Sequence, residues 1–414
     1  MAADSKGTAA GARGTRPTVH LVNSRAELRE FIALPGRLEG WSTYDVPVRA
    51  DEITKWYRGR SVLPGVRLWL ARDRTGAAVG RMVTHQSALL NGRLSRGPEA
   101  LGEHVRAQLF GAFVAADQVV ARALIRQVTR MAHGVGATHV FGPCTLLPNM
   151  GGGVLRSGFD RPAFLTGAWN PDWLPQVLEE EGYNAWHVTD TWRIDVSKIP
   201  AERAVRPTES DWRAKGLRLR RPGRFRVRAE TLDLLWVLND SYGHLPYFTK
   251  LSREYLGEKL AGLEPLLDPN LLVMADDAFD GRTVSFSLAM PDPSVLLRVS
   301  DGRIDHRSTA RLVRAKLRGE ARDAVLIAQA THPDAQLGGA LNLVTRELYA
   351  SLREGGYDQL HIGRISRDNP GAAAVLSKAG GHPEQETAFY IRELPNEHWD
   401  PESEDDEDDV LGFF

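Results

Sequence analysis

The sequence predicts a mixed α/β fold built from two similar lobes. Residues 325–381 read as a strand, a glycine-bearing turn, a helix, a strand and a second helix. Residues 118–142 repeat the order of helix, glycine stop and strand. The segments 177–194 and 375–392 both start with Val-Leu, carry a glycine five residues on and end in an aromatic-rich run. An internal repeat of one α/β unit is the economical explanation.

Length and composition restrict the class of protein. A chain of 414 residues is long enough for two domains that each bury a core. The net charge of −1 gives the whole molecule no bulk attraction for nucleic acid or membrane. The chain has no apolar run long enough to span a bilayer and no hydrophobic signal core at its start, so we expect a cytoplasmic protein without a membrane partner. The single cysteine, Cys144, excludes an internal disulfide and a cysteine-based zinc cluster, and we predict no metal site.

The chain divides into four segments. Residues 1–18 are small and polar and predict a disordered leader, and 396–414 form an acidic tail that we also expect to be disordered. Residues 19–205 form the first lobe and 206–395 the second. Each lobe shows a hairpin pattern, around Asp73-Arg74-Thr75-Gly76 in the first lobe and around Asp280-Gly281 in the second.

The turn at Gly338-Gly339 is the main candidate for a binding site. It follows an apolar strand and precedes a helical pattern of leucines and valines that ends at Gly355-Gly356. A helix that starts at such a turn presents free backbone N–H groups and a positive dipole end, and small residues let an anion approach the backbone. The alternative is that the two glycines only form a tight corner between strand and helix.

Two motifs of the second lobe resemble those of the GNAT superfamily of acyl-CoA N-acyltransferases. Gln336-Leu337-Gly338-Gly339-Ala340-Leu341 resembles its pyrophosphate loop, Gln/Arg-x-x-Gly-x-Gly/Ala, and Asn369-Pro370-Gly371-Ala372 resembles its later Asn-x-x-Ala segment. Two positions depart from the family. Leu341 stands in place of the final Gly or Ala of the loop, and Leu376 stands where many members carry the Tyr that protonates the leaving thiolate. The resemblance implies tandem GNAT-like lobes with the donor site in the second.

The first lobe looks like a degenerate copy. Phe113-Val114-Ala115-Ala116-Asp117 occupies the place of the glycine-rich turn, so we expect no pyrophosphate site there. The resemblance narrows to two-lobed bacterial GNAT-like proteins through Gly142-Pro143, Gly158-Phe159-Asp160 and Asn170-Pro171. The triple-glycine loop 148–153 either lets a ligand approach the backbone or forms a mobile surface loop.

The resemblance implies an enzyme that forms an amide by transferring an acyl group from acyl-CoA, as a co-substrate, to a small-molecule amine, with no permanently bound cofactor. Catalysis then needs groups that move protons and hold an oxyanion. The candidates are catalytic His332, His361 and Ser366, donor-binding Gln336, Leu337, Gly338, Gly339, Ala340, Leu341 and Asn369, and acceptor-side Asn239, Tyr242 and His244. Each histidine and each acceptor-side residue also has a purely structural interpretation, as a strand-end or helix-end polar group.

An arginine-rich stretch between the lobes leaves the donor open. Such a stretch is usually a solvated face, but arginine also binds phosphate in a bidentate manner. The candidates for tRNA or phosphate contact are Arg218, Arg220, Arg221, Arg224, Arg226 and Arg228, with a second basic cluster at residues 311–318. The alternatives to acyl-CoA transfer are an aminoacyl-tRNA-dependent transferase of natural-product biosynthesis and a non-catalytic ligand-binding protein. No nucleophile elbow, HExxH helix or Walker loop is present, which disfavours hydrolase, metalloprotease and NTPase functions.

Overall fold

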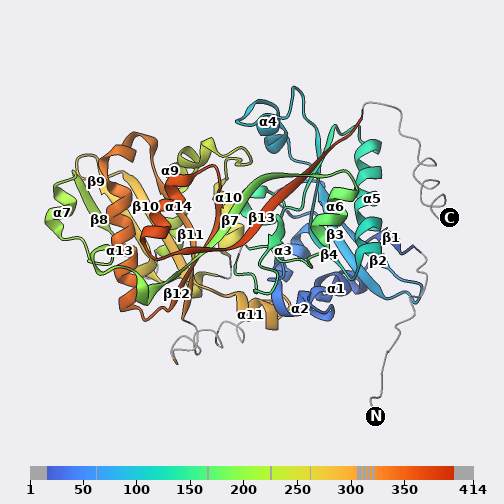
Figure 1. Cartoon of the computed structure of the whole chain (residues 1–414), viewed down its shortest axis with the longest axis horizontal. Coiled ribbons are helices and arrows are strands. Elements are labelled where there is room, and N and C mark those ends of the chain that lie inside the picture. The colour runs from blue at the N-terminus through green and yellow to red at the C-terminus, as the bar shows by residue number, and fades with distance from the viewer. Residues whose placement is uncertain are drawn as a thin grey trace, which may run out of the picture.

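The computed structural model shows two lobes that share one continuous β-sheet (Figure 1). It describes residues 16–395 except 62, 166, 224–225, 262, 305–309, 311–313, 315–317 and 319–321. Most of the predicted leader, the acidic tail and most of the second basic cluster lie outside the described residues. Within the described part of the chain, 13 strands form the sheet in the order β1-β2-β3-β4-β5-β13-β7-β12-β11-β10-β9-β8, with β6 paired to β13.

The first lobe begins with an antiparallel meander and ends with two helix–strand units. The bounds are β1 (Thr18–Leu21), α1 (Arg25–Ala33), α2 (Trp41–Tyr44), α3 (Ala50–Tyr57), β2 (Arg67–Arg72), β3 (Ala78–His85), α4 (Ala88–Arg96), β4 (Ala107–Ala115), α5 (Gln118–Gly134), β5 (His139–Gly142), β6 (Val154–Ser157), α6 (Leu174–Glu180) and β7 (Asn184–Asp195). Ser24 is the N-cap of α1, and its side chain accepts the Glu27 N–H in a capping box. β4 and β5 are parallel, as expected for strands joined through a helix.

The second lobe repeats this order. Its bounds are α7 (Glu209–Arg213), β8 (Leu217–Arg220), α8 (Val227–Asp233), α9 (Leu235–Ser241), α10 (Arg253–Leu260), β9 (Leu272–Asp277), β10 (Thr283–Pro291), α11 (Ser294–Val299), β11 (Asp323–Thr331), α13 (Ala340–Glu354), β12 (Gln359–Ser366), α14 (Pro370–Lys378) and β13 (His382–Glu393). Residues 227–241 form two short consecutive helices, α8 and α9. Both lobes have helices on either face of the sheet, so each buries two apolar layers.

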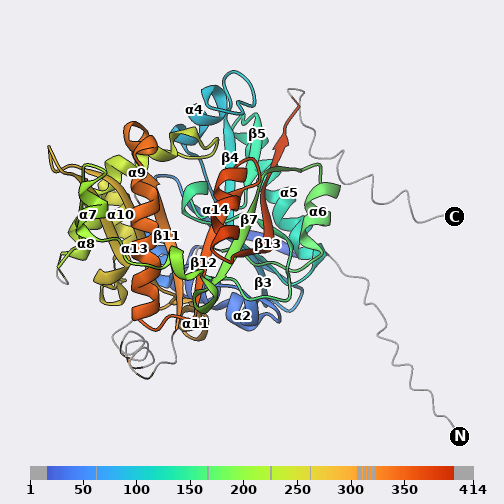
Figure 2. The same ribbon diagram turned by 60° about the vertical axis from the view of Figure 1, so that its left-hand side comes forward.

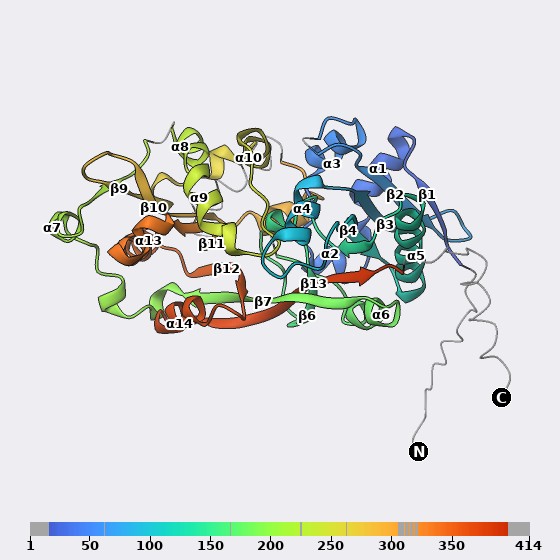
Figure 3. The same cartoon turned by 90° about the horizontal axis from the view of Figure 1, so that it is seen from above.

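The last strands of the two lobes are exchanged, which the sequence did not predict. β7 of the first lobe pairs with β12 of the second, and β13 of the second lobe pairs with β5 of the first. β7 and β13 also pair with each other and run side by side through the middle of the molecule (Figures 1 and 3). Thr189 lies opposite Thr387, their hydroxyls are 2.9 Å apart, and the two residues are 198 positions apart. The same spacing relates Val177 to Val375, so this threonine pair lies on a pseudo-twofold axis.

The exchanged strand β13 supplies apolar side chains to the first lobe. Phe389 packs against Phe141 of β5, with ring centroids 5.3 Å apart, and against Tyr247 at 5.5 Å. It belongs to a core cluster that contains first-lobe residues from α4, β4 and β5. The core of the first lobe is therefore completed by β13, the last strand in the part of the chain that the structure describes. In the view turned by 60° from Figure 1, β13 leads from the region of α14 toward α5 and α6 (Figure 2).

This exchange makes a prediction about stability. Phe389→Ala should lower the free energy of unfolding by about 3–5 kcal/mol, because it removes a buried aromatic side chain and leaves a cavity. The matched control is Phe279→Ala, since Phe279 is 100% exposed and should contribute within about 0.5 kcal/mol. Urea unfolding followed by tryptophan fluorescence measures both. Equal effects of the two substitutions would show that β13 does not complete the first lobe's core.

Candidate functional site

An opening between two parallel strands forms the centre of the candidate site. β11 and β12 pair only through Asp323–Leu326 and Gln359–Ile362, and then they separate. At this point Ile327 bulges out of register with β10, and its side chain is 37% exposed. A bulge leaves one residue of a strand unpaired, so its backbone groups are available to a ligand. The opening therefore contains main-chain polar groups beside an apolar side chain.

The glycine turn lies at the end of β11 and opens α13. After a 3₁₀ helix (Pro333–Gly338), Gly339 adopts a left-handed conformation with φ of 79°, which favours glycine. Within the described chain, no side chain caps α13, and no hydrogen bond is found for the N–H groups of Ala340 and Leu341. A side-chain carbon on Gly338 would meet no described atom within 4 Å. Of the predicted cradle at residues 336–341, the N–H groups of Ala340 and Leu341 are thus open to an anion. Residues 336–338 instead lie in the 3₁₀ helix, which pairs backbone N–H groups with carbonyls three residues earlier.

Two further side chains border the turn. Leu341, whose bulk departs from the family motif, is 40% exposed, so it does not fill the space at the helix start as a buried side chain would. A side-chain carbon on Gly339 would lie 3.6 Å from Cε and 3.8 Å from Nζ of Lys215. Lys215 is exposed and brings a positive charge to the same helix end. Sequence reasoning did not single out Lys215, because only folding brings the α7–β8 turn beside residue 339.

The corresponding helix of the first lobe is closed to anions. Asp117 is the N-cap of α5, and its carboxylate accepts the N–H of Val120 at 2.9 Å. This carboxylate occupies a backbone donor and places a negative charge at the positive end of the helix. At the start of α13, Gly339 has no such carboxylate. An anion is therefore expected to bind at the start of α13 and not at the start of α5.

The two candidate histidines lie at different ends of the opening. His332 follows β11 and lies 3.6 Å from Asp240 and 3.5 Å from Asp334, with its ring against Trp236. His361 lies where β12 is still paired, opposite Val325, and stacks on Phe164. Seven residues of extended strand separate Val325 from His332, which is roughly 20 Å. The structure does not bring the two histidines together, and of the two only His332 lies at the separated end of the strands.

Ser366 and Asn369 shape the loop that starts α14. The Ser366 hydroxyl accepts the N–H of Asp368 at 3.2 Å. Asn369 is the N-cap of α14, and its Oδ1 accepts the N–H of Ala372 at 3.1 Å. Both side chains therefore hold the loop beside the opening, and Leu376 on α14 is buried.

The acceptor-side candidates lie near the end of β11. Two of them form hydrogen bonds with backbone groups of other segments. Asn239 binds both the N–H and the C=O of Leu251. The Tyr242 hydroxyl donates to the carbonyl of Gln329 at 2.9 Å, and burial raises the pKa of Tyr242 to about 12. His244 is exposed and contacts the Ser241 carbonyl. Of the three candidates, Tyr242 is thus the one whose side chain forms a hydrogen bond with β11.

Several of the candidate arginines are engaged within the second lobe. Arg220 contacts Glu230, Asp276 and Thr283, and Arg221 contacts Glu347, a fully buried carboxylate on α13. Arg226 lies 3.3 Å from Glu230 and Arg228 lies 3.4 Å from Glu264. Arg218 is exposed on β8, and Arg224 lies outside the described residues. These ion pairs give the stretch a structural role in holding α8 and α13 against the sheet.

The first lobe has its own pocket at the separated ends of β4 and β5. It contains about 80 Å³ of open space between Trp41, Trp169, the Cys144 segment and the glycine loop. The glycine loop is held in place, because Gly152 bridges to Cys144 and Gly153 N–H donates to the Pro143 carbonyl at 2.7 Å. The loop thus lines a pocket, which agrees with the interpretation in which glycines give access to the backbone. Asp45 and the buried Arg81 are its charged members.

The comparison with solved structures identifies the fold. A tandem GNAT protein from the clavulanic acid biosynthesis pathway superposes with a TM-score of 0.55 at 11% identity, covering 92% of this chain and all of the other. The chain has the tandem GNAT fold. A GCN5-related N-acetyltransferase from Sphaerobacter thermophilus gives a TM-score of 0.50 at 11% identity, covering 93% and 98% of the two chains. A glucosamine N-acetyltransferase region of a fungal β-N-acetylglucosaminidase gives 0.56 at 12%, where this chain spans 38% of the longer protein.

Two curated proteins match this chain in sequence over most of their length. A bacterial ceramide synthase from Caulobacter vibrioides is 26% identical over 378 residues, which is 87% of this chain and 93% of that protein. Protein YghO from Escherichia coli is 23% identical over 394 residues, which is 90% and 94% of the two chains. No protein-family model matches the sequence. Across the described ranges, none of the helices has the length and apolar composition needed to cross a bilayer.

The first-lobe pocket generates a prediction about pH. Burial raises the pKa of Asp45 to about 6, outweighing the opposing effect of the Arg81 guanidinium. Because this pKa lies above that of the unfolded chain, the folded state binds the proton more tightly, and stability is lost as pH rises from about 4 through 6. Asp45→Asn, which cannot ionise, should therefore gain stability relative to the natural chain over this range, by up to about 2–3 kcal/mol. Urea unfolding at pH 4.5, 6 and 7.5 measures the difference, and parallel pH profiles would contradict it.

Proposed function

We propose that this protein is an N-acyltransferase that moves an acyl group from acyl-CoA to an amine and forms an amide. The observation that carries the proposal is the open turn at Gly338-Gly339, where unpaired N–H groups of α13 lie beside the Lys215 ammonium. A helix N-terminus with an adjacent cation binds a pyrophosphate through charge and hydrogen bonds together. The tandem GNAT fold supports coenzyme A as the source of that pyrophosphate.

The separation of β11 and β12 gives the rest of the donor a place beside the turn. A thioester chain that enters from the turn would run along β11 toward the bulge at Ile327. There the amine nitrogen attacks the carbonyl carbon, the C–S bond breaks, and the thiolate leaves with the coenzyme. The nitrogen loses one proton and the thiolate gains one, so the reaction needs no external oxidant or reductant. A backbone N–H at the bulge, where β11 no longer pairs with β12, would suit the oxyanion that forms during the attack.

The apolar character of the opening supports a donor or acceptor with a hydrocarbon chain. Ile327, Leu341 and Val375 belong to the three elements that border it, and they are 37%, 40% and 44% exposed. Exposed aliphatic side chains on neighbouring elements favour the binding of an apolar ligand. The similarity to a ceramide synthase points the same way, because a ceramide is the amide of a fatty acid and a long-chain amino alcohol. We therefore favour a long-chain amine as acceptor over a polar one.

The turn can be tested by binding alone. Gly338→Val should leave stability nearly unchanged, because a side-chain carbon there meets open space, yet it should weaken coenzyme A binding at least tenfold by occupying the cradle. Lys215→Glu should also weaken binding about tenfold by reversing a charge beside the phosphate site. The control is Lys198→Glu, which reverses an exposed lysine that pairs with Asp195. Calorimetric titration with coenzyme A measures all four proteins, and equal affinities would remove the turn from the donor site.

The reaction itself is tested by thiol release. Acyl-CoA donors from acetyl to palmitoyl are offered with a long-chain amino alcohol, with a short polar amine and with no amine. Amine-dependent thiol release and amide detected by mass spectrometry support the proposal. Binding of charged tRNA that falls steeply with salt, without any acyl-CoA turnover, would instead indicate the tRNA-dependent alternative. Tight coenzyme A binding with no turnover of any donor would favour a non-catalytic protein.

A further inference from the structure

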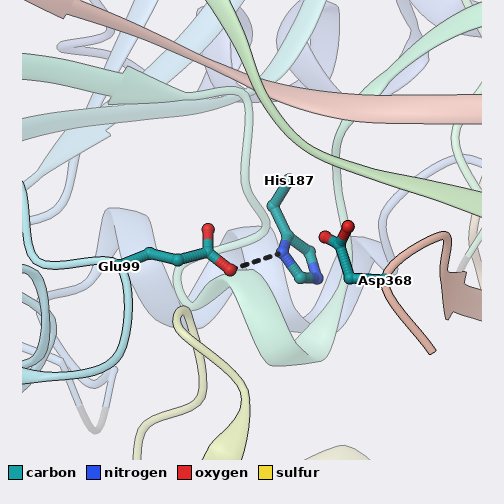
Figure 4. A group of neighbouring side chains, drawn as sticks. All are labelled: Glu99, His187 and Asp368. Atoms are coloured by element: carbon teal, nitrogen blue, oxygen red, sulfur yellow. Dashed lines mark ion pairs between the residues drawn. The ribbon is translucent and has the colours of Figure 1, made fainter.

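Three side chains that are distant in sequence converge where the two lobes meet. Glu99 comes from the loop between α4 and β4, His187 from the exchanged strand β7, and Asp368 from the loop that leads into α14 (Figure 4). One nitrogen or oxygen from each residue lies within 4.8 Å of the others. Figure 4 shows the imidazole between the two carboxylates, with an ion-pair contact of 3.8 Å from Nδ1 of His187 to Glu99.

His187 is the unusual member of this group. Its side chain is only 3% exposed, yet among the described residues neither ring nitrogen has a hydrogen-bond partner. A buried polar atom without a partner is costly, and native structures seldom leave both nitrogens of a buried imidazole unused. Trp186 and Tyr247 pack against the ring, with centroids 5.8 and 4.9 Å away, and fix its position. The imidazole is therefore held in place beside two carboxylates with its bonding capacity unfilled.

The backbone around the cluster is strained. Glu99 and His187 both have a φ of 54°, a left-handed conformation that non-glycine residues rarely adopt. Such conformations cost about 1–3 kcal/mol each, and they concentrate at ligand-binding and catalytic positions. In this case they belong to two of the three converging side chains.

We propose that Glu99, His187 and Asp368 bind a divalent first-row transition-metal ion such as Zn²⁺. One imidazole nitrogen with two carboxylate oxygens is a ligand set suited to these ions, and two negative charges match the charge of the cation. Three protein ligands leave at least one coordination position for water or a substrate atom. Around a Zn²⁺ ion the ligand atoms would lie roughly 3–3.5 Å apart. The three ligand atoms lie within 4.8 Å of one another, so binding draws the side chains together by about 1 Å.

His187 has the free nitrogen that coordination requires. A neutral imidazole binds a metal ion through a nitrogen lone pair, and among the described residues neither ring nitrogen of His187 has a hydrogen-bond partner. A bound ion would tie the first-lobe loop to β7 and to the start of α14, next to the Asn369 cap. It would therefore fix the relative positions of the two lobes at the edge of the candidate site.

The test uses the full-length chain without an affinity tag, stripped with a chelator and dialysed. Titration with Co²⁺, followed by visible absorption, should show one ion per chain, and Zn²⁺ should displace it. Zn²⁺ should also raise the melting temperature, because a ligand that binds only the folded state stabilises it. Asp368→Asn and Glu99→Gln each remove one ligand charge and should weaken binding at least tenfold. Glu103→Gln is the matched control, since it removes an exposed carboxylate from the same loop without touching the cluster.

Three results would overturn the site. One is the absence of a cobalt band and of any zinc-dependent melting shift at 100-fold excess of metal over protein. Another is binding that stays unchanged in both ligand variants, which would place the ion elsewhere. The third is equal weakening by Glu103→Gln, which would show a diffuse charge effect. His187→Ala is used only as a supplement, because it opens a cavity and can fail to fold. The metal titration does not depend on coenzyme A binding at residues 338–341. A negative result for the metal site therefore leaves the proposed function untouched, and the reverse also holds.

Discussion

The antiparallel pairing of β7 with β13 is the constraint on which the rest of the molecule depends. Each strand ends one lobe in sequence and completes the sheet of the other in space. A strand left at a sheet edge exposes unpaired backbone groups, and the exchange removes two such edges at once. Because Thr189 and Thr387 meet at the pseudo-twofold axis, the two lobes are also held in one relative orientation. The core around Phe389 then contains side chains from both lobes.

This arrangement also creates the candidate site. β12 is held on one side by β7, so its separation from β11 on the other side does not leave it unsupported. The turn and the start of α13 lie at the separated end. The phosphate recognition that we propose there would depend mainly on backbone N–H groups and on two glycines, because these groups can approach a phosphate closely. Backbone recognition places few demands on side chains, which is consistent with a shared fold at only 11–12% identity to the solved structures.

The two lobes differ at the start of their corresponding helices, α5 and α13. At the start of α5 the Asp117 carboxylate occupies a backbone donor, whereas at the start of α13 Gly339 leaves the donors open and Lys215 adds a positive charge. The first lobe has instead a separate pocket lined by the triple-glycine loop and by Asp45 and Arg81. The meeting line of the lobes carries the third distinctive group, His187 between Glu99 and Asp368.

The sequence by itself determined the mixed α/β class, the repeat and the glycine turn before α13. These features depend on local patterns such as apolar periodicity and glycine conformation, which can be recognised over a few residues. Only the tertiary structure decided that the last strands are exchanged, that the basic stretch mostly pairs with acidic groups of its own lobe, and that His332 and His361 lie apart. It also brought Lys215 to the turn and assembled Glu99, His187 and Asp368. The physical reason is that long-range pairing and charge neutralisation depend on which surfaces meet after folding. The spacing of residues along the sequence does not show which surfaces these are.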